Sequence, residues 1–195
     1  MAAGPAPALV GEGLALARGG RLLLSALDFR LQPGEALLLL GPNGSGKTSL
    51  LRAIAGLLPP FEGRLDNPFP VALAGTEPAL KPEQTLGAEL AFWADLDGAA
   101  PAARTGATAA MALEPLLDLP CAWLSAGQRQ RAALARVIAS GAPLWLLDEP
   151  TAMLDAASTA RLEAALAGHL AEGGLVVAAT HQPLDLPNAR SLLLG

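Results

Sequence analysis

The sequence predicts one α/β domain over residues 1–195, with a mostly parallel central sheet, a small antiparallel β piece and an inserted helical lobe at about 78–122. Three observations support this fold class. Short apolar runs of strand length alternate with helical segments, which is typical of a parallel sheet covered on both faces. The loop Gly41–Thr48 is glycine-rich and stands between an apolar strand and a helix. Residues 86–118 are alanine-rich and helical in pattern, with breaks at 98–101.

The element boundaries follow from turn and helix-stop residues. Gly19 and Gly20 separate the first strands, Pro59 and Pro60 prevent continuation of a helix, and a glycine pair at 173–174 ends another helix. In chain order, the expected elements are short strands within 8–31, a strand at 35–40, a helix from about 47 to 56, a short strand after the prolines, a strand at 69–75, the helical lobe, a helix within 123–141, a strand within 143–150, a helix within 158–174, a strand at 175–180 and a last strand at 189–195.

Composition and charge restrict the possible partners. Hydrophobic residues make up 52% of the chain and charged residues 16%, which favours a large core over disorder. The formal net charge of −5 argues against nucleic acid as the main partner, because phosphate backbones attract clustered Lys and Arg. A single cysteine, Cys121, excludes an internal disulfide and suits a reducing compartment, and we expect it to be a buried apolar residue.

No segment has the pattern of a membrane span or a secretory signal. The longest apolar runs fall short of the roughly 18–20 residues that a span requires. The first ten residues lack a basic region followed by an apolar one. If the protein acts at a membrane, another chain is expected to supply the spanning segments.

The loop GPNGSGKT predicts a phosphate-binding site and thus a P-loop NTPase fold, because it fits the spacing G-x-x-x-x-G-K-[S/T] in the required strand–loop–helix context. Glycines let successive backbone N–H groups point inward, and the helix that follows adds its positive dipole end. Lys47 would reach the β- and γ-phosphates and the Thr48 hydroxyl would hold Mg²⁺. A chance glycine-rich turn before a lysine is the alternative, and the flanking pattern argues against it. The predicted binding residues are Gly41, Pro42, Asn43, Gly44, Ser45, Gly46, Lys47, Thr48 and Ser49.

Two adjacent carboxylates, Asp148 and Glu149, follow the apolar run 144–147. The carboxyl ends of parallel strands are where open α/β sheets bind ligands. Buried carboxylates there need a cation or hydrogen bonds. Asp148 is therefore a candidate Mg²⁺ ligand, and Glu149 is a candidate general base that polarises a water. The alternative is that both only cap a following helix, which does not explain the apolar strand before them.

Two further polar sites are predicted. Ser125 and Gln128 have the S-x-x-Q spacing of a capping box, and Ser125 together with the Gly127 N–H could also form an anion site that faces another subunit's nucleotide. His181 directly follows a buried strand, where it is either structural or in contact with the γ-phosphate. His169 is expected on the surface. The arginines 129, 131 and 136 are expected on a solvated helix face.

Several motifs occur together in an order that resembles the ABC-type ATPases. GPNGSGKT, LSAGQ, LWLLDEP, AMLD (152–155) and His181 look like the Walker A, signature, Walker B, D-loop and switch-histidine motifs. Within that superfamily, LSAGQRQRAALAR, APLWLLDEPTAMLD, LKPEQT and ATHQPLDLP resemble the haem exporter ATP-binding subunits of cytochrome c biogenesis.

The resemblance implies roles for the residues that match each motif. Lys47 and Thr48 bind triphosphate and Mg²⁺, Asp148 supports Mg²⁺, Glu149 is the general base and His181 senses the γ-phosphate, so that Glu149, His181 and Lys47 form the catalytic set. Ser125, Gly127 and Gln128 engage ATP bound to the opposite protomer, and Asp155 lines the interface between protomers.

The resemblance also implies partners and location. The cofactors would be ATP and Mg²⁺, held between two copies of the chain as a homodimer in the ATP-bound state. The helical lobe at about 78–122 would grip an integral membrane subunit (CcmB-like) acting with other cytochrome c maturation components. The chain would then lie at the cytoplasmic face of the bacterial inner membrane. The exported group would be haem, or a haem-bound chaperone would be remodelled.

The sequence departs from the family pattern at three places. It has no tyrosine to stack on adenine, and Arg18, whose guanidinium can stack on a base, falls near that position. The loop after the strand at 69–75 carries Glu77 where a metal-contacting glutamine is usual, with Gln84 as the other candidate; a carboxylate can coordinate Mg²⁺. Ala126 replaces a glycine of the signature, as in the exporter subunits.

Two other classes of protein share part of this pattern. A soluble ABC-type regulator acting on nucleic acid or the ribosome usually has two ATPase domains or a long coiled coil, and this chain has neither pattern. A P-loop kinase would have no use for LSAGQ. The leading expectation is therefore an ATPase subunit of a membrane transporter.

Overall fold

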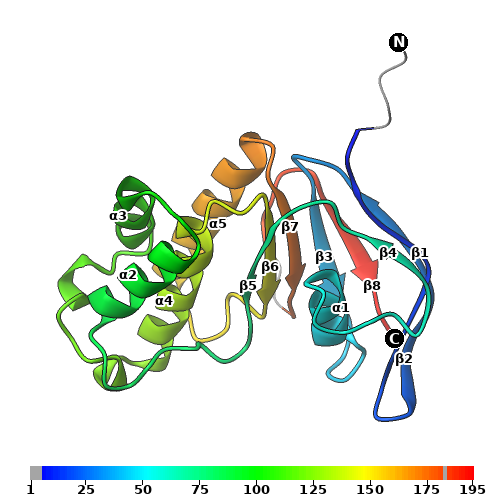
Figure 1. The fold of residues 1–195 in the computed structure, drawn as a ribbon, viewed down its shortest axis with the longest axis horizontal. Helices are drawn as coiled ribbons and strands as arrows, with labels where there is room; N and C mark the ends of the chain where they lie inside the picture. The colour runs from blue at the N-terminus through cyan, green and yellow to red at the C-terminus, as the bar shows by residue number, and fades with distance from the viewer. Residues whose placement is uncertain (1–5, 182–183) are drawn as a thin grey trace.

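Two β-sheets and a set of helices make up the fold in the computed structural model, which describes residues 6–181 and 184–195 (Figure 1). The strands are β1 Leu9–Arg18, β2 Arg21–Leu31, β3 Ala36–Leu40, β4 Glu62–Asp66, β5 Val71–Ala74, β6 Leu144–Asp148, β7 Leu175–Ala179 and β8 Ala189–Leu193. The helices are α1 Lys47–Ile54, α2 Leu86–Leu96, α3 Pro101–Ala110, α4 Ala126–Ala139 and α5 Ala156–Ala171, with 3₁₀ turns at Glu114–Leu116 and Cys121–Trp123.

The larger sheet is parallel in every pairing and has the strand order β5-β6-β7-β3-β8, which confirms the predicted parallel sheet. All five residues of β6 and all five of β7 are buried. Helices cover both faces of a parallel sheet, so its central strands are apolar throughout rather than alternating. Because β3, β6 and β7 are neighbours and run in the same direction, the residues that follow them meet at one edge.

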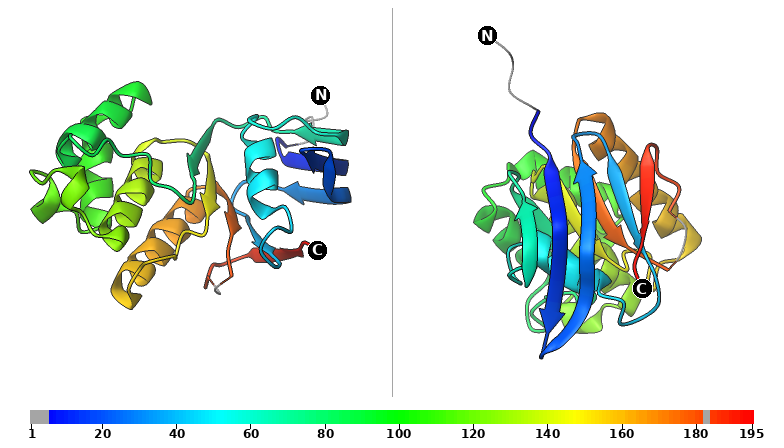
Figure 2. Two further views of the ribbon diagram at one scale, coloured as in Figure 1. Left: turned by 90° about the horizontal axis from the view of Figure 1, so that it is seen from below. Right: turned by 90° about the vertical axis from the view of Figure 1, so that its right-hand side faces the viewer.

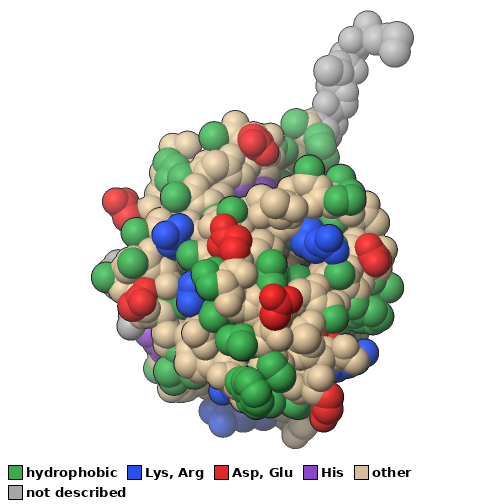
Figure 3. All heavy atoms as spheres, turned by 90° about the vertical axis from the view of Figure 1, so that its left-hand side faces the viewer, with side chains coloured by type: hydrophobic (Ala, Val, Ile, Leu, Met, Phe, Trp, Pro, Cys, Tyr) green, Lys and Arg blue, Asp and Glu red, His purple; other side chains and the backbone are tan. Residues whose placement is uncertain are grey.

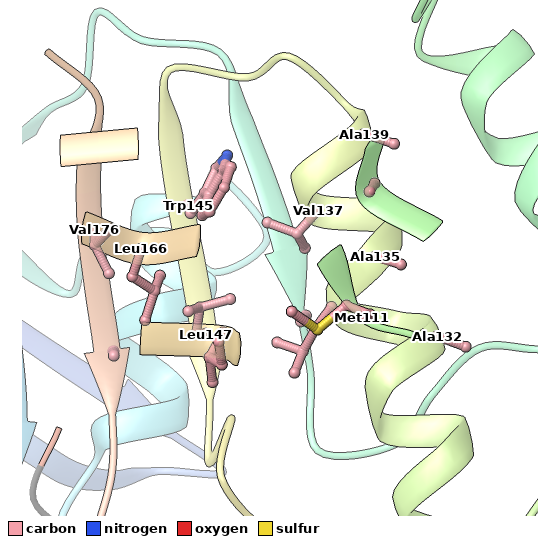
Figure 4. Packing of buried hydrophobic residues seen from close by; sticks show 14 of the residues in the cluster. Met111, Ala132, Ala135, Val137, Ala139, Trp145, Leu147, Leu166 and Val176 are labelled. Atoms are coloured by element: carbon pink, nitrogen blue, oxygen red, sulfur yellow. The ribbon is translucent and has the colours of Figure 1, made fainter. Parts of the chain in front are cut away.

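The core lies on the two faces of this sheet. Leu146 belongs to the cluster formed with α1 and the smaller sheet, whereas the next residue, Leu147, belongs to the cluster formed with the other helices. Side chains of successive strand residues point to opposite faces, so one strand serves both clusters. Figure 4 shows part of the second cluster, with Trp145 and Leu147 on β6 beside Val137 of α4 and Leu166 of α5.

The smaller sheet is antiparallel, with the order β2-β1-β4. The expected short strands within 8–31 are in fact two long strands of 10 and 11 residues joined by the turn at Gly19–Gly20, so that prediction was wrong in length. Register shifts between Gly11 and Ala17 interrupt the pairing of β1 with β2. Such irregularities bend and twist a long ribbon, which is visible in the right panel of Figure 2.

The helices α2, α3 and α4 lie together beside the parallel sheet (Figures 1 and 2). Two arginines of α4, Arg131 and Arg136, hold this group, and Arg129 Nη1 donates to Leu124 O at 2.6 Å, so the expected solvated arginine face was wrong. Arg131 Nη1 donates to the carbonyls at the end of α3, Met111 O at 2.8 Å and Ala112 O at 2.9 Å. The Arg136 guanidinium lies 3.5 Å from the centre of the Trp93 ring on α2, and its burial lowers the pKa of that group. Arginine has a long apolar stem, so a charged helix pattern does not show whether the head group is in water.

The burial of Cys121 and of His169 can also be compared with what the sequence predicted. Cys121 is buried as expected, and burial raises the pKa of its thiol. His169 is half-buried rather than on the surface, because its ring stacks on Trp145 with 3.8 Å between ring centres and its Nε2 lies 3.2 Å from Pro143 O. In the described part of the chain, no helix combines the length and apolar character needed to cross a membrane.

Candidate functional site

A cavity of about 360 Å³ opens where β3 and β6 end. It is lined by the glycine loop after β3, by Asp148 and Glu149 at the end of β6, and by Arg18 from the end of β1. Backbone hydrogen bonds continue past the ends of the strands: the Glu149 N–H donates to Ala179 O at 2.8 Å, and the Thr180 N–H to Leu39 O at 3.2 Å. The sheet edge therefore fixes the positions of the three segments that follow β3, β6 and β7.

The glycine loop has a backbone conformation that side chains at its glycine positions would prevent. Gly41, Gly44 and Gly46 all have positive φ angles, of 144°, 82° and 100°. A Cβ on Gly41 would overlap Leu194 O, and one on Gly46 would lie 2.9 Å from the Leu24 side chain. The fixed glycines of the motif are thus required by both φ and space.

The loop fits a polyphosphate group. The Lys47 side chain is buried and its Nζ donates to Gly41 O at 2.6 Å and to Pro42 O at 3.1 Å, so the ammonium is held inside the loop. Within the described residues, the buried Ser45 Oγ has no hydrogen-bond partner. A buried hydroxyl without a partner is costly. A phosphate oxygen in the loop would satisfy it.

Thr48 and Asp148 form the candidate metal position. The Thr48 hydroxyl donates to Asp148 Oδ2 at 2.8 Å, and Asp148 is only 3% exposed. Hydroxyl and carboxylate oxygens are ligands that Mg²⁺ accepts, and Mg²⁺ on nucleotides takes few protein ligands. Among the described residues, no group of three or more His, Cys, Asp or Glu side chains could hold a metal ion. The pair therefore suits a metal that is also held by phosphate oxygens.

Glu149 and His181 meet beside the loop. His181 Nε2 lies 3.2 Å from Glu149 Oε1, and the His181 backbone N–H donates to Glu149 Oε2 at 3.3 Å. The same Nε2 lies 3.4 Å from Lys47 Nζ and 2.7 Å from Asn43 Oδ1. Glu149 has a φ of 50°, a strained conformation for a residue with a side chain, which is often found at functional sites. The structure brings together the three predicted catalytic residues.

The N-terminus of α4 presents the segment LSAGQ. Ser125 Oγ accepts from the Gln128 N–H at 3.2 Å and Gln128 Oε1 accepts from the Ser125 N–H at 2.7 Å, so the capping box is present. Ser125 and Ala126 are exposed. A Cβ on Gly127 would lie 2.6 Å from Met153 O, so only glycine allows the loop after β6 to approach the helix this closely.

Comparison with known proteins identifies the family. The model of the ABC transporter family matches residues 24–152. The chain belongs to the ABC transporter family. Within it, a cytochrome c biogenesis ATP-binding export protein CcmA from Rhodospirillum rubrum is 50% identical over 97% of this chain and 87% of its own length. The CcmA of Sphingopyxis alaskensis is 48% identical, covering 94% and 95%. The chain is therefore a member of the CcmA-type group of ABC proteins.

Solved structures agree on the fold of this ABC protein. An ABC transporter ATP-binding protein from Pyrococcus furiosus superposes with a TM-score of 0.83 at 23% identity, covering 96% of this chain and 98% of that one. An inward-facing transporter of metal-chelate type gives a TM-score of 0.81 at 28% identity, covering 96% and 79%.

Arg18, Glu77 and Gln84 are residues at which the sequence departs from the usual ABC pattern, and they differ in how close they lie to the cavity. Arg18 lines the cavity, and its contact with adenine stays a prediction. Glu77 is exposed, and it is the preceding residue, Thr76, that lines the cavity. Gln84 is exposed, and its carbonyl accepts from the Cys121 N–H at 2.8 Å, at the start of the helical region. A metal contact from Glu77 stays a prediction.

Sequence reasoning missed two features of the site. It did not single out Thr76, although this residue follows β5 at the same edge of the sheet as the motifs. It did not foresee that Asp155 caps α5 by accepting from the Ser158 N–H at 2.7 Å. Hydrogen bonds from the Ser158 side chain and from its backbone N–H lower the pKa of Asp155. An Asp directly before a helix is a common capping signal, so the position of Asp155 could have predicted the contact.

Proposed function

We propose that this chain is the ATP-hydrolysing subunit of an ABC export complex in cytochrome c biogenesis, with haem as the exported group. The observation that best supports this function is that Lys47, Thr48, Asp148 and Glu149 line one cavity. His181 lies against two of these residues, Lys47 and Glu149. The curated relatives named as cytochrome c biogenesis export proteins, at 44–50% identity over nearly the whole chain, give the pathway. Haem is proposed because these relatives are named as export proteins of cytochrome c biogenesis and the motifs resemble those of haem exporter subunits.

The glycine loop would bind the triphosphate of ATP. Lys47 would exchange its two carbonyl acceptors for phosphate oxygens, and the free Ser45 hydroxyl would take another. Thr48 and Asp148 would hold Mg²⁺, which supplies charge neutralisation at the β- and γ-phosphates. Arg18 would lie against adenine through its guanidinium plane.

Hydrolysis needs a base and a group that orients the γ-phosphate. Glu149, at the end of β6, would take a proton from the attacking water. His181 Nε2 would donate to a γ-phosphate oxygen, because it already lies between Lys47 and Glu149. The short distances among these groups mean that a single bound phosphate could touch all of them.

A second copy would complete the site. Ser125, Gly127 and Gln128 would reach the ATP held by the partner copy, with Asp155 close to the same interface. Two large apolar side chains next to this helix tip, Trp123 and Met153, are 74% and 75% exposed, as expected for residues that a partner covers.

A membrane subunit of the CcmB type would bind the helical region at about 78–122, and would place this chain at the cytoplasmic face of the inner membrane. On α2, Phe92 and Leu96 are 47% and 64% exposed. Figure 3, which views the molecule from the side of these helices, shows Lys, Arg, Asp and Glu scattered rather than a single basic patch. That surface suits a protein partner better than nucleic acid.

Replacing the base tests this function. Glu149→Gln is expected to bind ATP, to lose at least about 100-fold in turnover and to accumulate as a dimer with ATP and Mg²⁺. Glu62→Gln on exposed β4 is the matched control and should turn over ATP normally. Size-exclusion chromatography and phosphate release give the two readouts. A Glu149→Gln protein that stays monomeric at every ATP concentration would contradict the dimer, and affinity purification from solubilised membranes tests the membrane subunit.

A further inference from the structure

His181 has three polar groups around one ring nitrogen. Its Nε2 lies 2.7 Å from Asn43 Oδ1, 3.2 Å from Glu149 Oε1 and 3.4 Å from Lys47 Nζ. The contact with Asn43 is the shortest and has the length of a good hydrogen bond. Asn43 lies in the glycine loop, 138 positions before the histidine.

These contacts determine which ring nitrogen carries a proton. The asparagine and glutamate oxygens accept hydrogen bonds, whereas a lysine ammonium only donates. Lys47 donates to Gly41 O and Pro42 O at shorter distances than its distance to the ring. Nε2 therefore donates, and in the neutral imidazole the proton sits on Nε2 while Nδ1 carries the lone pair.

We propose that Asn43 is a positioning residue for His181: its amide oxygen holds the Nε2–H of the ring over the glycine loop and competes for that proton with Glu149. This inference rests on the proposed ATPase function for its consequence, but the contact itself does not. A phosphate oxygen in the loop would share this proton with Asn43 Oδ1, so that the ring need not reorient when ATP binds.

The competition with Glu149 matters because the histidine contacts both carboxylate oxygens. The His181 backbone N–H donates to Oε2 at 3.3 Å, and the ring lies 3.2 Å from Oε1. Without an acceptor on the loop side, the ring proton would bond only to Glu149. A carboxylate held by two donors is a weaker base toward water. Asn43 thus draws the histidine donor toward the loop and weakens its hydrogen bond to Glu149.

The tautomer can be read directly, because the chain has only two histidines. Long-range ¹H–¹⁵N NMR spectra at about pH 8.5, where an ordinary imidazole is neutral, assign the proton to one nitrogen of each ring. We expect His181 to be the Nε2–H tautomer in the wild type. Asn43→Leu, which has a similar shape but no acceptor, should shift the His181 ring signals, and Asn43→Asp, which keeps the acceptor, should shift them less. His169, which lies against Pro143 O, is the internal control.

A double-mutant cycle tests the functional consequence. Asn43→Leu should lower kcat about tenfold with less than about a twofold change in ATP affinity, and in a His181→Ala background it should change kcat by less than about twofold. An equal loss in both backgrounds would show that Asn43 does not act through His181. A wild-type His181 in the Nδ1–H form, or His181 signals unchanged by Asn43→Leu, would overturn the contact. The NMR spectra need no turnover, so absence of ATPase activity would refute only the proposed function.

Discussion

Replacing Gly127 with alanine should separate the tip of α4 from the loop after β6. The new Cβ would lie 2.6 Å from Met153 O, whereas ordinary van der Waals contact begins at 3.4 Å. One of the two backbones must move by about 0.8 Å to relieve this overlap. Both are backbone segments, so no side-chain rotation can relieve it.

The change in the free energy of unfolding caused by Gly127→Ala is the sum of two opposing contributions. Overpacking of this kind costs about 1–3 kcal/mol. Alanine in a helix gains about 0.5–1 kcal/mol over glycine. Gly106→Ala in α3 isolates the second contribution, because nothing lies within 4 Å of its added Cβ. For a chain of this length, about 1 kcal/mol shifts Tm by about 2–4 °C. The difference between the Tm values of the two variants should therefore be about 2–12 °C, with Gly106→Ala the more stable.

Differential scanning calorimetry measures this difference, and ATPase assays measure its effect on function. A displacement of about 1 Å at a catalytic interface can cost about 100-fold in rate, so Gly127→Ala should lose far more turnover than stability, while Gly106→Ala should retain full turnover. Equal Tm values for the two variants would refute the close approach of Gly127 to Met153. Unchanged turnover in Gly127→Ala would show that the tip of α4 does not act on ATP.

Three other changes have defined outcomes. Arg131→Met removes two hydrogen bonds to the end of α3 and should lower the free energy of unfolding by about 2 kcal/mol in urea titrations; no change would show that the arginine does not hold the helices together. Burial lowers the pKa of His169, so the unfolded chain binds a proton on this imidazole more readily than the folded chain does. The free energy of unfolding should therefore fall as pH drops below about 6.5. His169→Phe, which retains a ring on Trp145, should weaken this pH dependence in the same titrations. Ser45→Ala removes a buried hydroxyl that has no partner among the described residues, so it should leave stability unchanged or slightly higher but weaken ATP binding about 3–10-fold by calorimetry. Unchanged affinity would exclude a phosphate contact.

Much of the fold could be predicted because strand-sized apolar runs and their boundaries are local features. The buried runs at 144–148 and 175–179 are the central strands, as their continuous apolar pattern predicted. Strand order was not predictable, since it depends on crossovers between distant segments. The roles of Arg131 and Arg136 were also missed, because their partners at 111–112 and 93 are about 20 and 43 positions away.

The candidate site could be predicted further than the fold, since its residues follow strands that are neighbours in a parallel sheet. Motif spacing indicated Lys47, and the position of Glu149 after an apolar strand indicated a general base; the ends of β3 and β6 bring the two residues to one cavity. Contacts between motifs were beyond the sequence. The distance of 2.7 Å between Asn43 and His181, and the close approach of Gly127 to Met153, depend on how separate loops pack.

The helix α4 joins two regions of the molecule as a single rod. Its 14 residues span about 21 Å. Ser125 caps its N-terminal end, while Arg131 and Arg136 connect the helix to α3 and α2. An α-helix resists compression and bending, so a force that tilts the neighbouring helices tilts the tip with them. Mechanical work delivered at the outer helices would therefore reach the tip as rigid rotation, with no need for any bond in between to break.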